Sequence, residues 1–187
     1  MTNIHFLFNF QKAIEAAGLF LDLCGGRTHN IRLMKLLYMA DRQCLGEEAR
    51  TITGDRFFAM QKGPGLCTVH DLIRKKDIRS PLWQCCIKTD EHDVIVANSP
   101  GTNELYQFEK KIIKDVFQST KDKNIVALTH TFPEWKKYEA SINDPNKKNS
   151  YPITIQDILE GLGKPELLST VEDKIADELY YSELFKT

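Results

Sequence analysis

The chain has 187 residues, of which 42% are hydrophobic, and its 25 basic and 26 acidic side chains leave a formal net charge of −1. This length and apolar content predict one domain, residues 1–187, with a single substantial core. A net charge so close to zero argues against a global attraction to nucleic acid or to an anionic membrane.

The cysteines and the first residues indicate the compartment. Five cysteines, an odd number without C-x-x-C spacing, predict reduced thiols rather than a disulfide framework. The first residues lack the basic region and the small-residue cleavage site of a secretory signal. Because no segment approaches the length of a membrane span, we expect a cytoplasmic protein without a membrane partner.

Two helices are predicted near the start of the chain. Apolar residues recur at steps of three and four over residues 10–24, and Gly25-Gly26 should end this helix. Asn30 can cap a second helix that runs to the region of Gly46. Asp41 lies on the apolar stripe of the second helix, so its carboxylate should point toward the interior or its edge.

A turn, a strand and a short helix follow. Thr53–Asp55 has turn chemistry, and residues 56–61 are typical of a short extended strand. Gly63–Gly65 should stop this strand. The apolar positions of the next, short helix are Leu66, Val69, Leu72 and Ile73.

The middle of the chain predicts a hairpin and then a longer helix. Trp83, Cys85 and Ile87 alternate with other residues, so residues 82–98 are expected to form a hairpin that turns at Asp90–His92. Helical spacing returns after Asn103, which can cap the next helix. The apolar positions of that helix are Leu105, Phe108, Ile112 and Val116.

The last part of the chain predicts short helices. One covers residues 125–130, another begins at residue 155, and residues 141–150 should form an exposed loop. Residues 166–187 predict a C-terminal amphipathic helix, which starts either at Pro165 or at the capping box Ser169–Glu172. The predicted fold class is therefore mainly α with minor β: a single compact helical globule with a small antiparallel hairpin or sheet.

Signatures of known enzymes are missing from the sequence. It contains no H-E-x-x-H, G-x-S-x-G, P-loop or Rossmann glycine pattern, and nothing in it requires a cofactor or a metal. A small hydrolase or transferase that uses Asp41, Asp55 and His130 is one alternative, because an imidazole paired with a carboxylate titrates near neutral pH. The structural interpretation, which we favour, is that His130, Asp41 and Arg56 satisfy one another as a polar cluster.

Two small basic clusters raise a second alternative. Lys110, Lys111 and Lys114 line one side of a predicted helix, and Arg74–Lys76 form another group. Such clusters are usually solvated faces, and no nucleic-acid recognition motif accompanies these two. A prophage DNA-binding regulator therefore stays an alternative, and a nucleic-acid partner is not expected.

One ordered set of short segments is the most informative feature of the chain. Its members are Lys35–Tyr38, Ala40-Asp41, Ile52–Arg56, Ala59-Met60, Gly63-Pro64, Asp71–Ile73, Ala127–His130 and Pro133–Trp135. This set resembles the Panacea antitoxin domain family, which includes SocA-like antitoxins and many phage-associated proteins. The resemblance covers about residues 10–165. Gly65 departs from it, because the family pattern has a bulky aliphatic residue there.

The resemblance implies an antitoxin that neutralises a cognate protein toxin by direct binding, or that delivers the toxin to an ATP-dependent protease. It also implies roles for the matching residues. The expected toxin-binding residues are Thr53, Gly54, Asp55, Met60, Gly63 and Pro64, and Phe57 is added because aromatic residues are enriched at protein interfaces. The expected structural polar cluster contains Tyr38, Asp41, Arg56, Thr129, His130 and Trp135. A homodimer is left open, and residues 166–187 either complete the core or add contact area for the partner.

Overall fold

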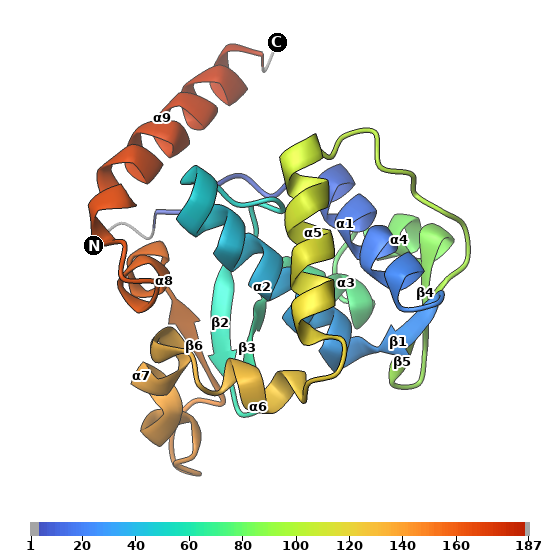
Figure 1. Ribbon diagram of the computed structural model, residues 1–187, viewed down its shortest axis with the longest axis horizontal. Coiled ribbons are helices and arrows are strands. Elements are labelled where there is room, and N and C mark those ends of the chain that lie inside the picture. Colours follow the sequence, from blue (N-terminus) through green and yellow to red (C-terminus); the bar gives the residue numbers. More distant parts are fainter. Residues whose placement is uncertain (1–3, 186–187) are drawn as a thin grey trace.

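A computed structural model describes residues 4–185 of the chain (Figure 1). Residues 1–3 and 186–187, the latter being the end of the predicted C-terminal helix, lie outside the described part. The helices are α1 (Phe10–Leu23), α2 (Asn30–Glu48), α3 (Cys67–Ile73), α4 (Ser80–Cys86), α5 (Gln107–Thr120), α6 (Ile125–Thr129), α7 (Pro133–Ile142), α8 (Ile155–Gly161) and α9 (Leu168–Leu184). A 3-10 turn, Pro165–Leu167, precedes α9. The strands are β1 (Arg27–His29), β2 (Phe57–Met60), β3 (Gly63–Leu66), β4 (Ile87–Asp90), β5 (Asp93–Val96) and β6 (Ser150–Ile153).

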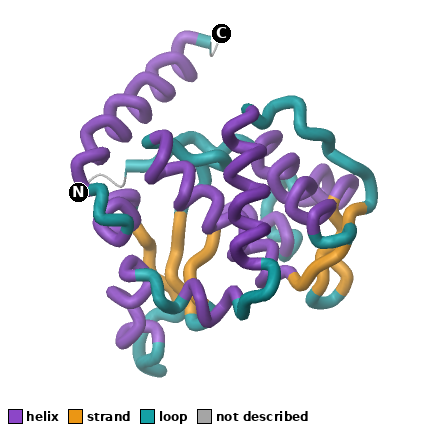
Figure 2. The backbone as a smooth tube through the Cα atoms, in the orientation of Figure 1, coloured by secondary structure: helices purple, strands orange, loops and turns teal. Residues whose placement is uncertain are grey.

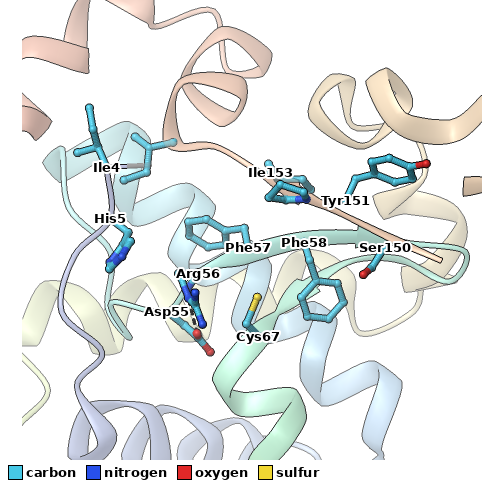
Figure 3. Close-up of a pocket in the computed structure, with 12 residues that line it drawn as sticks. Ile4, His5, Asp55, Arg56, Phe57, Phe58, Cys67, Ser150, Tyr151 and Ile153 are labelled. Carbon is cyan, nitrogen blue, oxygen red and sulfur yellow. Dashed lines mark hydrogen bonds between the residues drawn. The ribbon is translucent and has the colours of Figure 1, made fainter. Parts of the chain in front are cut away.

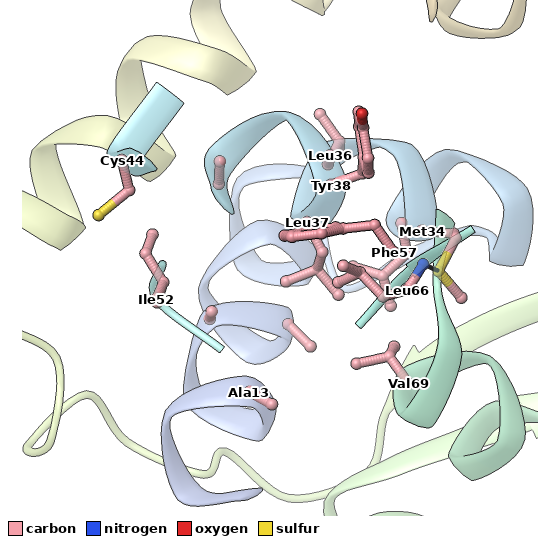
Figure 4. Close-up of a cluster of buried hydrophobic side chains, with 14 of the residues drawn as sticks. Ala13, Met34, Leu36, Leu37, Tyr38, Cys44, Ile52, Phe57, Leu66 and Val69 are labelled. Carbon is pink, nitrogen blue, oxygen red and sulfur yellow. Dashed lines mark hydrogen bonds between the residues drawn. The ribbon is translucent and has the colours of Figure 1, made fainter. Parts of the chain in front are cut away.

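Helix α2 lies at the centre of the molecule and contacts α1, α5, α6 and β3. Its middle, Leu33–Ala40, is apolar except for Lys35, which is the pattern of a helix segment buried on several sides. Leu36, Leu37 and Tyr38 are buried, and they pack with side chains of α1 and of the β2–β3 hairpin (Figure 4). The position of every later element is therefore set by contacts with α2 or with the elements that cover it.

The strands form two small antiparallel sheets that lie in different parts of the molecule (Figure 2). One sheet has the order β1-β5-β4, and its β4–β5 hairpin pairs Asp90 with Asp93. The other has the order β3-β2-β6, so that β2 pairs with β3 on one side and with β6 on the other. The predicted class, mainly α with a small antiparallel β component, is confirmed.

The hairpin predicted over residues 82–98 is too long. Only residues 87–90 and 93–96 are strands, and Ser80–Cys86 is helical. Pro81 lies in the first turn of α4, where its missing N–H group removes no helical hydrogen bond. Trp83 and Ile87 are both fully buried, but Trp83 lies in α4 whereas Ile87 is the first residue of β4.

The prediction that Gly63–Gly65 end the extended segment is wrong. These residues belong to strand β3. Phe58 pairs with Gly65 in the register, and a Cβ atom at position 65 would lie 2.9 Å from the Phe58 ring and 3.3 Å from Met34. The absence of a side chain at Gly65 thus makes room for the phenyl ring.

Sequence reasoning missed β1, α7 and β6, and it misplaced two helix caps. The predicted loop 141–150 is shorter, because α7 runs to Ile142 and β6 begins at Ser150. Helix α2 is capped by His29 rather than Asn30, since the His29 ring accepts a hydrogen bond from the N–H of Ile31. Helix α5 begins after Tyr106, whose N–H donates to Glu109 at 2.8 Å.

No helix within residues 4–185 combines the length and the apolar character that a membrane crossing requires. The assignment of all 187 residues to one domain stays a prediction.

Gly54 provides a test of the packing between the N-terminal segment and the turn that follows α2. Its φ is +68°, and a Cβ atom there would lie 1.9 Å from the Leu7 carbonyl oxygen. Gly163 has a φ of +69° with nothing within 4 Å of such a Cβ atom, so it isolates the backbone effect. We expect Gly54→Ala to lower the free energy of unfolding by about 3 kcal/mol or more, against about 1 kcal/mol for Gly163→Ala. Urea denaturation of both variants measures this difference, and equal losses would contradict the predicted clash.

Candidate functional site

The β2–β3 hairpin is attached to α2 along the outer edge of β3. The Lys35 ammonium group donates to the carbonyl oxygen of Pro64, and the N–H of Leu66 points to the sulfur of Met34 at 3.3 Å. Pro64 has no N–H group, so in its pairing with Ala59 it must occupy a position whose backbone groups face away from β2. Two side chains of α2 therefore occupy the backbone groups that an edge strand normally leaves unpaired.

Lys35 is almost completely buried, and its burial lowers the pKa of the ammonium group to about 7. The backbone of Gly63 passes close to it, with φ at +97°. A Cβ atom at Gly63 would lie 2.9 Å from Thr129 Oγ1 and 3.0 Å from Lys35 Nζ. A glycine at this position thus lets the hairpin approach α2 and α6 at the same time.

His130 and Trp135 cover the end of the hairpin. Their rings are stacked, with centroids 4.0 Å apart and an interplanar angle of 5°, and Trp135 Nε1 donates to the carbonyl oxygen of Met60 at 2.9 Å. The Nε2 atom of His130 is buried and has no hydrogen-bond partner within residues 4–185. Burial and the nearby charge of Lys35 lower the pKa of His130.

Asp41 and Asp55 both bind backbone N–H groups in the interior. Asp41 accepts hydrogen bonds from the N–H groups of Ile52 and Thr53, at 2.8 and 3.0 Å, and from the Thr53 hydroxyl. Asp55 accepts from Thr68 and Val69 at 3.0 and 2.9 Å. Asp41 thereby fixes the turn after α2, and Asp55 fixes the start of α3. Burial raises the pKa of both carboxyl groups, that of Asp41 to about 7.

Glu134 forms a third buried polar group, which sequence reasoning missed. Its Oε1 atom accepts from the Tyr38 hydroxyl at 2.9 Å and from Arg42 Nε at 2.6 Å. A Cβ atom at Gly161 would lie 2.3 Å from Glu134 Oε2, so glycine is needed where α8 ends. The signal in the sequence is that Tyr38 and Arg42 lie four residues apart on α2 and therefore face the same partner. Lys35, the other missed residue, is marked by its place inside the apolar run Leu33–Met39.

A hollow of about 220 Å³ opens between the N-terminal segment, β2 and β6 (Figure 3). Phe57, Phe58 and Ile153 form apolar parts of its wall, and His5 and Arg56 are among its polar lining. Arg56 is exposed, and Phe58 is half-buried. The hollow thus offers an apolar surface beside an exposed guanidinium group.

The structure separates the residues that were expected to form one polar cluster. Tyr38 contacts Glu134; Asp41 holds the turn at Ile52 and Thr53; Thr129, His130 and Trp135 surround the hairpin end. Arg56 is exposed. The expectation that His130, Asp41 and Arg56 satisfy one another is therefore wrong, because the hydrogen-bond partners of the Asp41 carboxylate are the backbone and the hydroxyl group of the neighbouring turn.

The expected toxin-binding residues lie mostly inside the chain. Met60 is half-buried, and the other six are buried; they are Thr53, Gly54, Asp55, Phe57, Gly63 and Pro64. Of these seven residues, Asp55 and Phe57 line the hollow. Next to the seven in the sequence, Arg56, Gln61 and Lys62 are exposed and Phe58 is half-buried.

The family described as "Antitoxin SocA-like, Panacea domain" matches residues 33–136, which is more than half of the chain. The chain belongs to this family. No curated protein and no solved structure shows significant similarity to it.

The matched part of the Panacea domain begins on α2 and ends on α7. It therefore contains the Lys35–Pro64 contact, the Asp41 and Asp55 interactions with the backbone, and the stacked His130–Trp135 pair. Strand β6 and helices α8 and α9 follow the matched segment. The suspected resemblance to the Panacea family is confirmed, whereas the assignment of toxin-binding residues stays a prediction.

The buried ammonium group of the Panacea hairpin predicts a measurable pH dependence. The folded chain releases the Lys35 proton near pH 7, whereas an unfolded chain keeps it to about pH 10. The wild-type free energy of unfolding should therefore gain a contribution on the order of 2 to 4 kcal/mol as the pH rises through this window, because only the unfolded state still binds the proton.

We expect Lys35→Met to lack this contribution, since the variant keeps an apolar stem but has no titratable group. The control is Lys114→Met, which changes an exposed lysine of α5. Urea denaturation at both ends of the pH window compares the three proteins. The assignment fails if the Lys35→Met protein gains as much stability as the wild type.

Proposed function

We propose that this Panacea-domain protein is the antitoxin of a toxin–antitoxin system and that it neutralises a cognate protein toxin by direct binding. The observation that carries this proposal is the family match over residues 33–136. The match includes the β2–β3 hairpin and the helices that contact it. It therefore also includes the buried hydrogen bonds made by Lys35, Asp41 and Asp55.

The arrangement of the buried carboxylates supports binding rather than chemistry. Asp41, Asp55 and Glu134 each accept hydrogen bonds from backbone N–H groups or from side chains of this chain. A general base needs a lone pair directed at a substrate, and these oxygens are directed at structural partners. The hollow in Figure 3 is lined by Asp55 but not by Asp41 or His130, so it does not unite the residues of the enzymatic alternative.

We further propose that the toxin contacts the hairpin face formed by Arg56, Phe58 and Met60. The buried residues behind this face fix its backbone in one conformation, which reduces the entropy lost on binding. Arg56 is exposed, and Phe58 and Met60 are half-buried. Arginine, aromatic residues and methionine are enriched at protein interfaces.

Co-expression with the adjacent gene tests the function. We expect the chain to restore growth of cells that express the neighbouring toxin gene, and to co-purify with the toxin as a stable complex. Recovery of growth without a stable complex would contradict neutralisation by direct binding, and it would favour delivery to an ATP-dependent protease or enzymatic reversal. Failure to restore growth would contradict the antitoxin function.

A charge reversal tests the proposed hairpin face. The Arg56 side chain is exposed, and the residue takes part in folding through its backbone N–H, which donates to Asp55. Arg56→Glu should therefore leave the melting temperature nearly unchanged and weaken toxin binding by about tenfold or more. Lys88→Glu on β4 is a matched charge reversal in the other sheet and should bind like the wild type. Calorimetric titration with the toxin compares the variants, and equal affinities would place the contact elsewhere.

A further inference from the structure

The C-terminal helix α9 is attached to the body by its first half. Val171 and Ile175 are buried, Lys174 Nζ donates to the carbonyl oxygen of Glu48 at 2.6 Å, and the N–H of Leu7 donates to Glu178 at 3.0 Å. The C-terminal end of the helix extends away from the body (Figure 1). The second half of α9 is therefore positioned by the first half.

This second half carries an unusual concentration of exposed apolar side chains. Its members are Leu179, Tyr180, Tyr181, Leu184 and Phe185, which are between 43% and 81% exposed. They account for five of the nine large exposed hydrophobic residues in the described chain. A segment of this length would not form a stable helix in water on its own. A partner that covers these side chains would remove their apolar surface from water and hold the helix in place.

The charge of α9 distinguishes between the classes of partner. The helix has five acidic residues, Glu172, Asp173, Asp177, Glu178 and Glu183, against the single basic residue Lys174. Helices that lie on anionic membranes carry lysine and arginine on their polar face, and proteins that bind nucleic acid are basic where they contact it. Pairing of two α9 helices would bring like charges together. A protein surface with a basic rim and an apolar floor complements both properties of the helix.

We propose that the end of α9, residues 179–184, together with Phe185 that follows it, binds in an apolar groove of the toxin that is bordered by lysine or arginine side chains. This inference rests on the proposed antitoxin function and adds the chemistry of the partner. Recognition of an amphipathic helix in a groove uses side chains at spacings of three and four. Tyr181 and Leu184 have this spacing, and Tyr180 and Phe185 flank them.

The test measures the affinity for the purified protein encoded by the adjacent gene. The double variant Tyr181→Ser/Leu184→Ser removes two side chains that extend beyond the body, so its melting temperature should match that of the wild type. We expect its Kd to rise by about 100-fold or more, because interface anchors carry most of the binding energy. The matched control is Ile78→Ser/Leu82→Ser, which removes two side chains that are 93% and 62% exposed near α4, and it should bind like the wild type.

A second variant tests the charge of the groove. Glu183→Gln should bind more weakly at low ionic strength, and its affinity should fall less steeply with added salt than that of the wild type. If the affinity of the variant depends on salt as steeply as that of the wild type, the proposal that lysine or arginine side chains border the groove is wrong.

The outcomes separate this inference from the proposed function. If the wild type binds the toxin and the Tyr181/Leu184 variant binds equally well, α9 is not the contact and only this inference fails. If the wild type neither binds nor neutralises the toxin, the proposed function fails, and this inference fails with it. Sedimentation that shows a homodimer dissociated by the α9 changes would assign the helix to a second copy, and it would also overturn the inference.

Discussion

The hydrogen bond from the buried Lys35 ammonium group to the Pro64 carbonyl joins the central helix to the β2–β3 hairpin, and much of the structure depends on that attachment. Strand β6 pairs with β2, and Trp135 of α7 donates to the hairpin at Met60. The position of these later elements therefore depends on where α2 holds the hairpin. An amine in this place is costly to desolvate, which is the physical origin of its lowered pKa.

Ion pairs in the interior also join helices that are distant in the sequence. Lys12 of α1 donates to both carboxylate oxygens of Glu109 on α5, at 2.7 and 2.9 Å, and Arg42 of α2 binds Glu134 of α7. Removal of one partner from such a pair leaves an uncompensated charge in the interior and is strongly destabilising. These pairs therefore favour one specific arrangement of helices that apolar packing alone would define less strictly.

Local pattern was enough to predict the elements whose side chains follow a clear period. Helices α1, α2, α3 and α5 were predicted because their apolar positions recur at helical steps, and the β4–β5 turn because of its polar residues. Strand β6 was missed because its partner, β2, lies about 90 residues earlier in the chain, and no local signal encodes that pairing. Trp83 was assigned to a strand because two or three alternating residues do not distinguish a strand from a short helix.

The candidate site shows a different limit of sequence reasoning. The segments around Asp41, Thr53 and Asp55 were recognised as a family pattern, yet their burial and their hydrogen bonds to the backbone became visible only in three dimensions. Asp41 illustrates the reason. Its place on the apolar stripe of α2 predicted an interior carboxylate, but the partner of that carboxylate could be the turn, Arg56 or His130, and sequence alone does not rank these distances.

The prolines of the β3-β2-β6 sheet have a consequence for how the protein meets other chains. Pro64 lies in one outer strand and Pro152 in the other, and each is paired with β2 in a position where its own backbone faces outward. The outer edge of β3 is already occupied by side chains of α2, and Pro152 interrupts the row of donors on the outer edge of β6, so pairing of another strand with this sheet is disfavoured on both sides. Recognition on this side of the molecule has to be made by side chains, and the same arrangement protects the sheet against self-templated aggregation.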